Sequence, residues 1–63
     1  MNSAATLHLD KTYSLTLGGD TLHNILNALG DAERSYRRAG FTGMAENAVN
    51  AYQMILKQIT EAK

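Results

Sequence analysis

Apolar and polar residues alternate along the N-terminal part of the chain. Between residues 11 and 17 the two sets separate by parity, with Tyr13, Leu15 and Leu17 against Thr12, Ser14 and Thr16. Period-two alternation rich in Tyr and Thr is typical of a half-buried β-strand. The pattern predicts a strand over residues 11–17 that ends at Gly18. Asp10 interrupts the alternation, so residues 6–10 either extend this strand or form a separate one.

From residue 21 onward the apolar spacing changes to three and four residues, the spacing of one helical face. A first helix is predicted over residues 21–39, capped by Asp20 or Thr21 and ended by Gly40. Its apolar positions are Leu22, Ile25, Leu26, Leu29, Ala32 and Tyr36. Gly30 interrupts the helix; the sequence leaves open whether it permits a close backbone approach or is a tolerated irregularity.

A second helix is predicted over residues 43–61, with Thr42 as its cap. Its main apolar stripe is Ala45, Ala48, Val49, Tyr52, Ile55, Leu56 and Ile59. Met44, Ala51 and Met54 flank this stripe and widen it beyond what one partner helix covers, and methionine is common at binding faces. We therefore expect Met44 and Met54 to belong to a second contact face. The short connection makes the helices antiparallel neighbours.

The expected fold class is α+β and mostly helical, with a short N-terminal strand before a two-helix hairpin. Residues 1–63 are expected to form one small domain, in which residues 1–5 are disordered. A 63-residue chain buries only about 60% of the surface that its unfolded form exposes. Such a chain is only marginally stable by itself, and it has no cysteine to form stabilising disulfides. Self-association is therefore the expected source of additional stability. A homodimer paired through its strands, or a higher oligomer, is the predicted assembly.

Composition narrows the possible functions. Six basic and six acidic residues balance, which counts against a nucleic-acid binder. His8 and His23 are too isolated to form a metal site. No nucleophile, base and orienting group stand at a helpful spacing, so no catalytic residue, enzymatic activity or cofactor is expected. No signal peptide or membrane-spanning run is apparent, so a cytoplasmic protein without a membrane partner is expected.

Arg34, Arg37 and Arg38 form the densest charge cluster of the chain. Guanidinium groups bind oxyanions with two parallel hydrogen bonds, so the three arginines are candidates for contacting a ligand or an acidic protein surface. The alternative is structural. Asp31 and Glu33 lie three and four residues before two of these arginines, and such pairs stabilise a helix.

The order strand, helix, helix resembles that of ribbon-helix-helix repressors, whose strands pair across a dimer and enter the DNA major groove. The resemblance implies that residues 11–17 form the ribbon. It gives Lys11, Thr12, Ser14 and Thr16 the outward, base-contacting role. The neutral chain lacks the phosphate-neutralising charge that such binding needs. DNA binding is therefore the alternative function.

The residues 13–17 followed by residues 22–29 also resemble, in size and layout, the opening of many small phage-encoded accessory proteins. That resemblance implies an oligomeric antagonist of bacterial defence. Such a protein binds a host defence protein or sequesters a signalling cyclic nucleotide. The leading expectation is thus a non-enzymatic, homo-oligomeric interaction protein.

Overall fold

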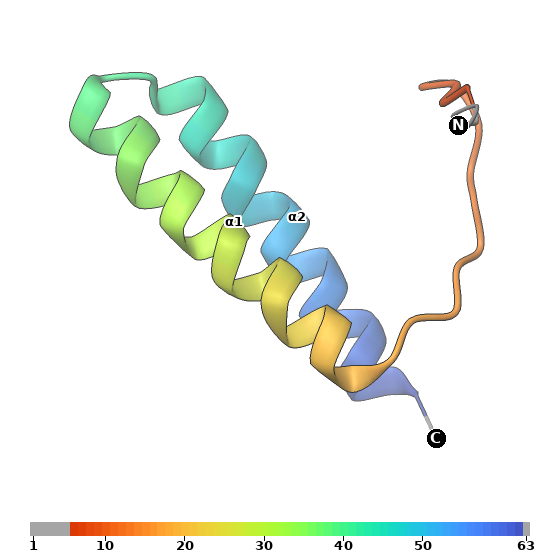
Figure 1. Cartoon of the computed structure of the whole chain (residues 1–63). Coiled ribbons are helices and arrows are strands. Elements are labelled where there is room, and N and C mark those ends of the chain that lie inside the picture. Colours follow the sequence, from red (N-terminus) through yellow and green to blue (C-terminus); the bar gives the residue numbers. More distant parts are fainter. Residues whose placement is uncertain (1–5, 63) are drawn as a thin grey trace, which may run out of the picture.

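Two long helices form an antiparallel hairpin in the computed structural model, which describes residues 6–62 (Figure 1). Helix α1 spans Gly19–Ala39 and helix α2 spans Thr42–Glu61. The helices therefore begin two residues and one residue before the predicted positions. Residues 6–18, here called the arm, precede α1 and run away from the hairpin along the side of α2.

The turn between the helices depends on Gly40. Its φ of 87° lies in the left-handed region, which a glycine adopts without the steric penalty of a Cβ atom. The N–H of Gly40 donates to the carbonyl of Arg37 at 3.1 Å, and the N–H of Phe41 donates to the carbonyl of Tyr36 at 2.8 Å. These bonds satisfy carbonyls that the end of α1 would otherwise leave free. The predicted stop at Gly40 is thus a hydrogen-bonded reversal.

The helix starts differ from the predicted caps. Gly18 is the N-cap of α1 and Phe41 that of α2, and neither makes a side-chain capping bond. Asp20 instead lies inside the first turn of α1, where its Oδ1 accepts from the N–H of Thr21 at 2.8 Å. A carboxylate there is favoured by the partial positive charge of a helix N-terminus. Thr42 is the first residue of α2 rather than its cap.

The predicted strand is wrong. Residues 12–18 have no regular secondary structure, and none of residues 6–62 belongs to a strand. A strand requires a neighbour to pair with its backbone N–H and C=O groups, and the described chain offers none. The α+β class and the strand-paired homodimer are therefore replaced by a two-helix hairpin.

The question about residues 6–10 is answered in the same way, since residues 9–10 lie in a turn closed by the N–H of Lys11 and the carbonyl of His8 at 3.2 Å. The prediction for residues 1–5 falls outside the described residues.

The helices pack through the predicted faces but enclose very little. Ala45 and Ala48, with 0% and 7% of their surface exposed, are the buried apolar residues of the described chain. The larger apolar side chains of the interface remain half-buried: Leu22, Ile25, Leu26, Leu29, Tyr36, Val49, Tyr52, Ile55 and Leu56. Two helices side by side cover each other on one side only, whereas a stable domain surrounds its core with packed layers. The hairpin therefore has half of a core.

The overall dimensions agree with this incomplete packing. The accessible surface is 5450 Å², whereas a compact monomer of 6.9 kDa exposes about 4000 Å². The Cα radius of gyration is 13.7 Å, whereas a compact domain of this length has about 10.6 Å. The chain thus exposes more surface than its mass requires.

Candidate interaction surface

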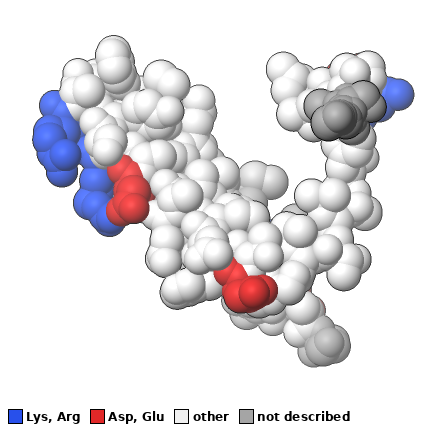
Figure 2. Space-filling model, viewed as in Figure 1, with Lys and Arg blue, Asp and Glu red and all other residues white. Residues whose placement is uncertain are grey.

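One broad side of the hairpin carries no charged side chain until the last turn of α2, where Glu61 lies two helical turns beyond Met54. Helical spacing places on it, from α1, Ile25, Ala28 and Ala32, and from α2, Met44, Ala51, Met54, Ile55 and Gln58. We call this set the uncharged face. The side of the hairpin turned toward the arm is white in Figure 2, whereas blue and red gather along the outer edge of α1.

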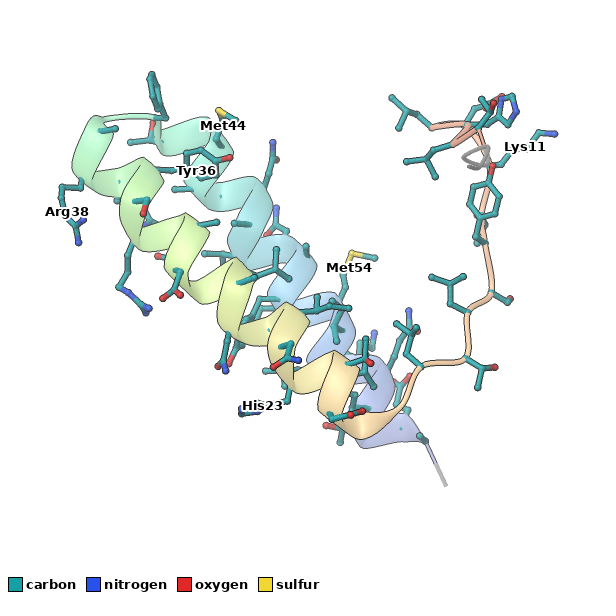
Figure 3. The ribbon with its side chains drawn as sticks, in the orientation of Figure 1. Lys11, His23, Tyr36, Arg38, Met44 and Met54 are labelled. Atoms are coloured by element: carbon teal, nitrogen blue, oxygen red, sulfur yellow. The ribbon has the colours of Figure 1, made fainter. Side chains whose placement is uncertain are left out.

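The methionines are the most exposed large side chains of the uncharged face. Met44 is 49% and Met54 is 63% exposed, and in Figure 3 both project from the same side of α2. Methionine has three flexible torsions and a polarisable sulfur, which suits it to an adaptable contact. The structure therefore places both predicted methionines on one surface, joined by small residues of α1.

An open groove separates the arm from the uncharged face. It encloses about 630 Å³. The arm lines it with residues 13 and 15–17, and the hairpin contributes Leu22, Ile25, Ala51, Met54, Ile55, Gln58, Ile59 and Ala62. Both walls are thus mostly apolar. An apolar groove that faces water is unfavourable in proportion to its area.

A smaller depression of about 260 Å³ lies on the opposite side of the hairpin, where Gly30 faces Val49 and Tyr52. A Cβ atom added to Gly30 would meet only the Arg34 Nη1 atom, at 3.8 Å, an ordinary contact. Gly30 is therefore not needed for a close approach of the helices, which answers the question that the sequence left open.

The arginines of α1 mostly form ion pairs within the helix. Arg34 pairs with Asp31, and the Arg37 Nε donates to the Glu33 Oε2 at 2.6 Å. Exposed pairs of this kind contribute about 0–1 kcal/mol. Arg38 has no ion pair among the residues that the structure describes, and it points away from both helices (Figure 3).

The candidate residues of the sequence do not converge on one site. Arg38 lies on the outer edge of α1, on the other side of the hairpin from Met54. The proposed base-contacting residues are all exposed in the arm, without a strand to hold them in register: Lys11, Thr12, Ser14 and Thr16. The Tyr13 hydroxyl accepts a hydrogen bond from the His8 N–H at 3.1 Å, so the turn at residues 8–11 is stabilised by hydrogen bonds within the arm itself.

Sequence reasoning missed the continuity of the uncharged face across both helices. It treated Ala28 as unremarkable and assigned Ile25 and Ala32 to the contact between the helices. The available signal was the lack of charge at residues 25, 28 and 32, together with residues 44, 51 and 54, because these positions meet when α1 and α2 run antiparallel.

Other chemistry is sparse in the described chain. His23 Nε2 lies 3.1 Å from the Asn27 amide nitrogen, one helical turn away. No group of three or more metal-ligating side chains occurs among residues 6–62. Within the same range, neither helix is long and apolar enough to cross a membrane.

Comparison with known proteins adds no family. No protein-family model, curated protein or solved structure matches the chain.

Proposed function

We propose that the chain is a non-enzymatic interaction protein whose folded unit is a homo-oligomer, built from hairpins that pair through the uncharged face. The observation that carries the proposal is the half-core of the single hairpin, in which alanines are buried and larger apolar residues are not. A second hairpin laid on the first would complete a four-helix arrangement, an architecture in which each helix buries its apolar stripe.

The exposed area is large enough for such pairing. The excess of about 1450 Å² over a compact monomer, to which the extended arm contributes, exceeds the roughly 800 Å² that each partner buries in an interface of standard size. Each buried square ångström of apolar surface contributes about 25 cal/mol. Since the uncharged face carries no ions, its burial avoids the desolvation cost of charges. Area and composition therefore both favour a second copy.

Light scattering coupled to size-exclusion chromatography tests the proposal. The wild-type chain is expected to elute at twice its 6.9 kDa mass or at a higher multiple. Met54→Lys is expected to shift the mass to that of a monomer and to reduce the helical circular dichroism, because it would bury an unpaired charge. The matched control is Gln53→Lys, an exposed position of α2 on the opposite side of the hairpin from the uncharged face. A folded, cooperative wild-type monomer at micromolar concentration would refute the proposal.

The narrower hypothesis is that the oligomer antagonises a bacterial defence protein or sequesters a signalling cyclic nucleotide. Its support is the resemblance to small phage-encoded proteins, and its candidate contact is Arg38, whose guanidinium is free of the helical pairs. Arg38→Ala is expected to weaken binding to a cyclic dinucleotide or a co-purifying defence protein, with little change in melting temperature. A variant that binds normally but melts much earlier would give Arg38 a structural role instead.

The DNA-binding alternative loses its structural support. The resemblance required a strand at residues 11–17 to act as the ribbon, and these residues form no strand. Lys11 is also the one basic residue of the described arm apart from His8. We therefore do not propose DNA binding.

A further inference from the structure

We infer that the arm clasps a second copy of the chain, with Leu15 of one copy packed on the uncharged face of the other near Met54. This inference rests on the self-association proposed above and specifies how the two copies hold each other. It gives a role to residues 6–18, which the hairpin itself leaves unused.

The first observation is the mismatch between the composition of the arm and its surroundings. The arm carries Leu7, Leu9, Tyr13, Leu15 and Leu17. Leu9 and Leu15 are 92% and 77% exposed. A segment that stays in water is normally poor in such residues, because each exposed apolar side chain forgoes the free energy of burial. The apolar residues of the arm therefore need a surface that their own hairpin does not supply.

The second observation is the direction of the arm. Gly18 is extended, with φ −71° and ψ 162°, and the preceding residues lead away from the helices (Figure 1). The arm thus stands opposite α2 and leaves the groove of about 630 Å³ open between them. An arm that served its own hairpin would close this groove.

The third observation is the matching character of the two groove walls. The helical wall is the uncharged face, and residues 12–18 of the arm also carry no charge. The occupant must therefore be apolar and uncharged on two sides at once. A second hairpin meets this requirement where its uncharged face packs on the helical wall and the outer edge of that face, at Met54, reaches the arm.

Symmetry completes the arrangement. In a dimer with a two-fold axis, every contact of the first copy on the second is repeated by the second on the first. The arm of each copy would thus pack on the hairpin of the other, and Leu15 of each copy would lie beside Met54 of the other. The arm would also cover the groove that the paired hairpins leave open.

The lack of cysteine allows a direct test by cross-linking. Leu15→Cys and isotope-labelled Met54→Cys are prepared separately, mixed and treated with a short bis-maleimide, and cross-links between labelled and unlabelled chains are counted by mass spectrometry. Proximity raises the effective thiol concentration from about 10 μM to about 1 mM, so cross-linking is expected about a hundredfold faster than with the control pair of Leu15→Cys and Gln53→Cys, because Gln53 lies at the depression on the opposite side of the hairpin. Circular dichroism verifies that each variant stays helical.

A second measurement uses Leu15→Ser, which removes the apolar group without adding charge. The dissociation constant of the dimer is expected to rise about a hundredfold, about tenfold for each of its two arms. Thr12→Ser, a conservative change at an exposed arm position, is expected to leave it unchanged.

The outcomes separate this inference from the proposed function. If the wild-type chain is a dimer but cross-links form only within single chains of a Leu15→Cys/Met54→Cys double variant, the arms are folded on their own hairpins, which overturns the arm exchange and leaves self-association intact. Equal cross-linking of the Met54→Cys and Gln53→Cys pairs, or an unchanged dissociation constant in Leu15→Ser, also overturns it. A wild-type monomer overturns the proposed function as well.

Discussion

Small residues determine the geometry of the hairpin at the places where the chain is most crowded or most sharply bent. Ala45 and Ala48 are buried where α2 meets α1, and their single methyl groups keep the helices close. Gly40 holds the left-handed conformation that reverses the chain. Close packing of the helices and reversal of the chain both require small side chains, because larger ones would clash at these positions.

Gly40 and Gly43 therefore respond in opposite ways to the same substitution. Gly40→Ala is expected to lower the free energy of unfolding by about 1–2 kcal/mol, because alanine pays a steric cost at positive φ. Gly43→Ala is expected to raise it by about 1 kcal/mol, because Gly43 lies in the first turn of α2 with open space around its Cβ position and alanine is the better helix former. Urea unfolding measures both. Equal effects of the two changes would contradict the assigned conformation of Gly40.

At the scale of the elements, the two helices differ in how their ends are charged. Helix α1 has Asp20 in its first turn and Arg37 and Arg38 in its last, which suits the helix dipole at both ends. Helix α2 has no acidic residue in its first turn and no basic residue in its last. Helix α2 therefore depends more on its packing than α1 does.

The bare N-terminus of α2 offers a test of that difference. Gly43→Glu is expected to be more stable than Gly43→Lys by about 0.5–2 kcal/mol at low salt, since each charge contributes about 0.3–1 kcal/mol with opposite sign. Glutamate and lysine have similar helix propensities, and the carboxylate of Glu46, three residues further along α2, opposes the dipole by about 0.2–0.5 kcal/mol for each charge. The gap is expected to shrink at 1 M salt, where screening is strong. A gap of the reverse sign would show that another charge dominates this end.

The helices were predictable from the sequence, whereas the structure of residues 11–17 was not. The spacing of Leu22, Ile25 and Leu29 predicted α1. A helix forms its hydrogen bonds and side-chain contacts between residues three and four positions apart, so its pattern can be recognised within the segment itself. The alternation of Tyr13 and Leu15 has the same regularity, yet it produced no strand. An extended segment becomes a strand only through a partner, and no partner is encoded within residues 6–62. The uncharged face was missed for a related reason, because it arises only when two helices are placed side by side.

At the scale of the whole molecule, the hairpin, the arm and the uncharged face form an unfinished structure. A single copy leaves both walls of a groove in water and exposes Leu9, Leu15 and Met54. The two proposals above complete it with one additional component, a second copy. They require no new conformation of either helix.

Folding and association are then expected to be one equilibrium, so the melting temperature is expected to depend on protein concentration. Between about 1 and 100 μM the concentration term changes by RT ln 100, about 2.7 kcal/mol, which shifts the midpoint by about 10 °C for a dimer of two such chains. Added salt is expected to change the midpoint little, because the uncharged face contributes no ions. Melting curves that superimpose over this concentration range would show that the hairpin folds without a second copy.

The half-core of the single hairpin has a consequence for a cell that makes this chain. Under the proposed pairing, a newly synthesised chain is susceptible to proteases until it associates with a second copy. The time before association becomes shorter as the concentration of the chain rises. Under the pairing proposed above, doubling the synthesis rate would more than double the surviving amount. The protein would thus act with a threshold, nearly absent at weak expression and abundant soon above it.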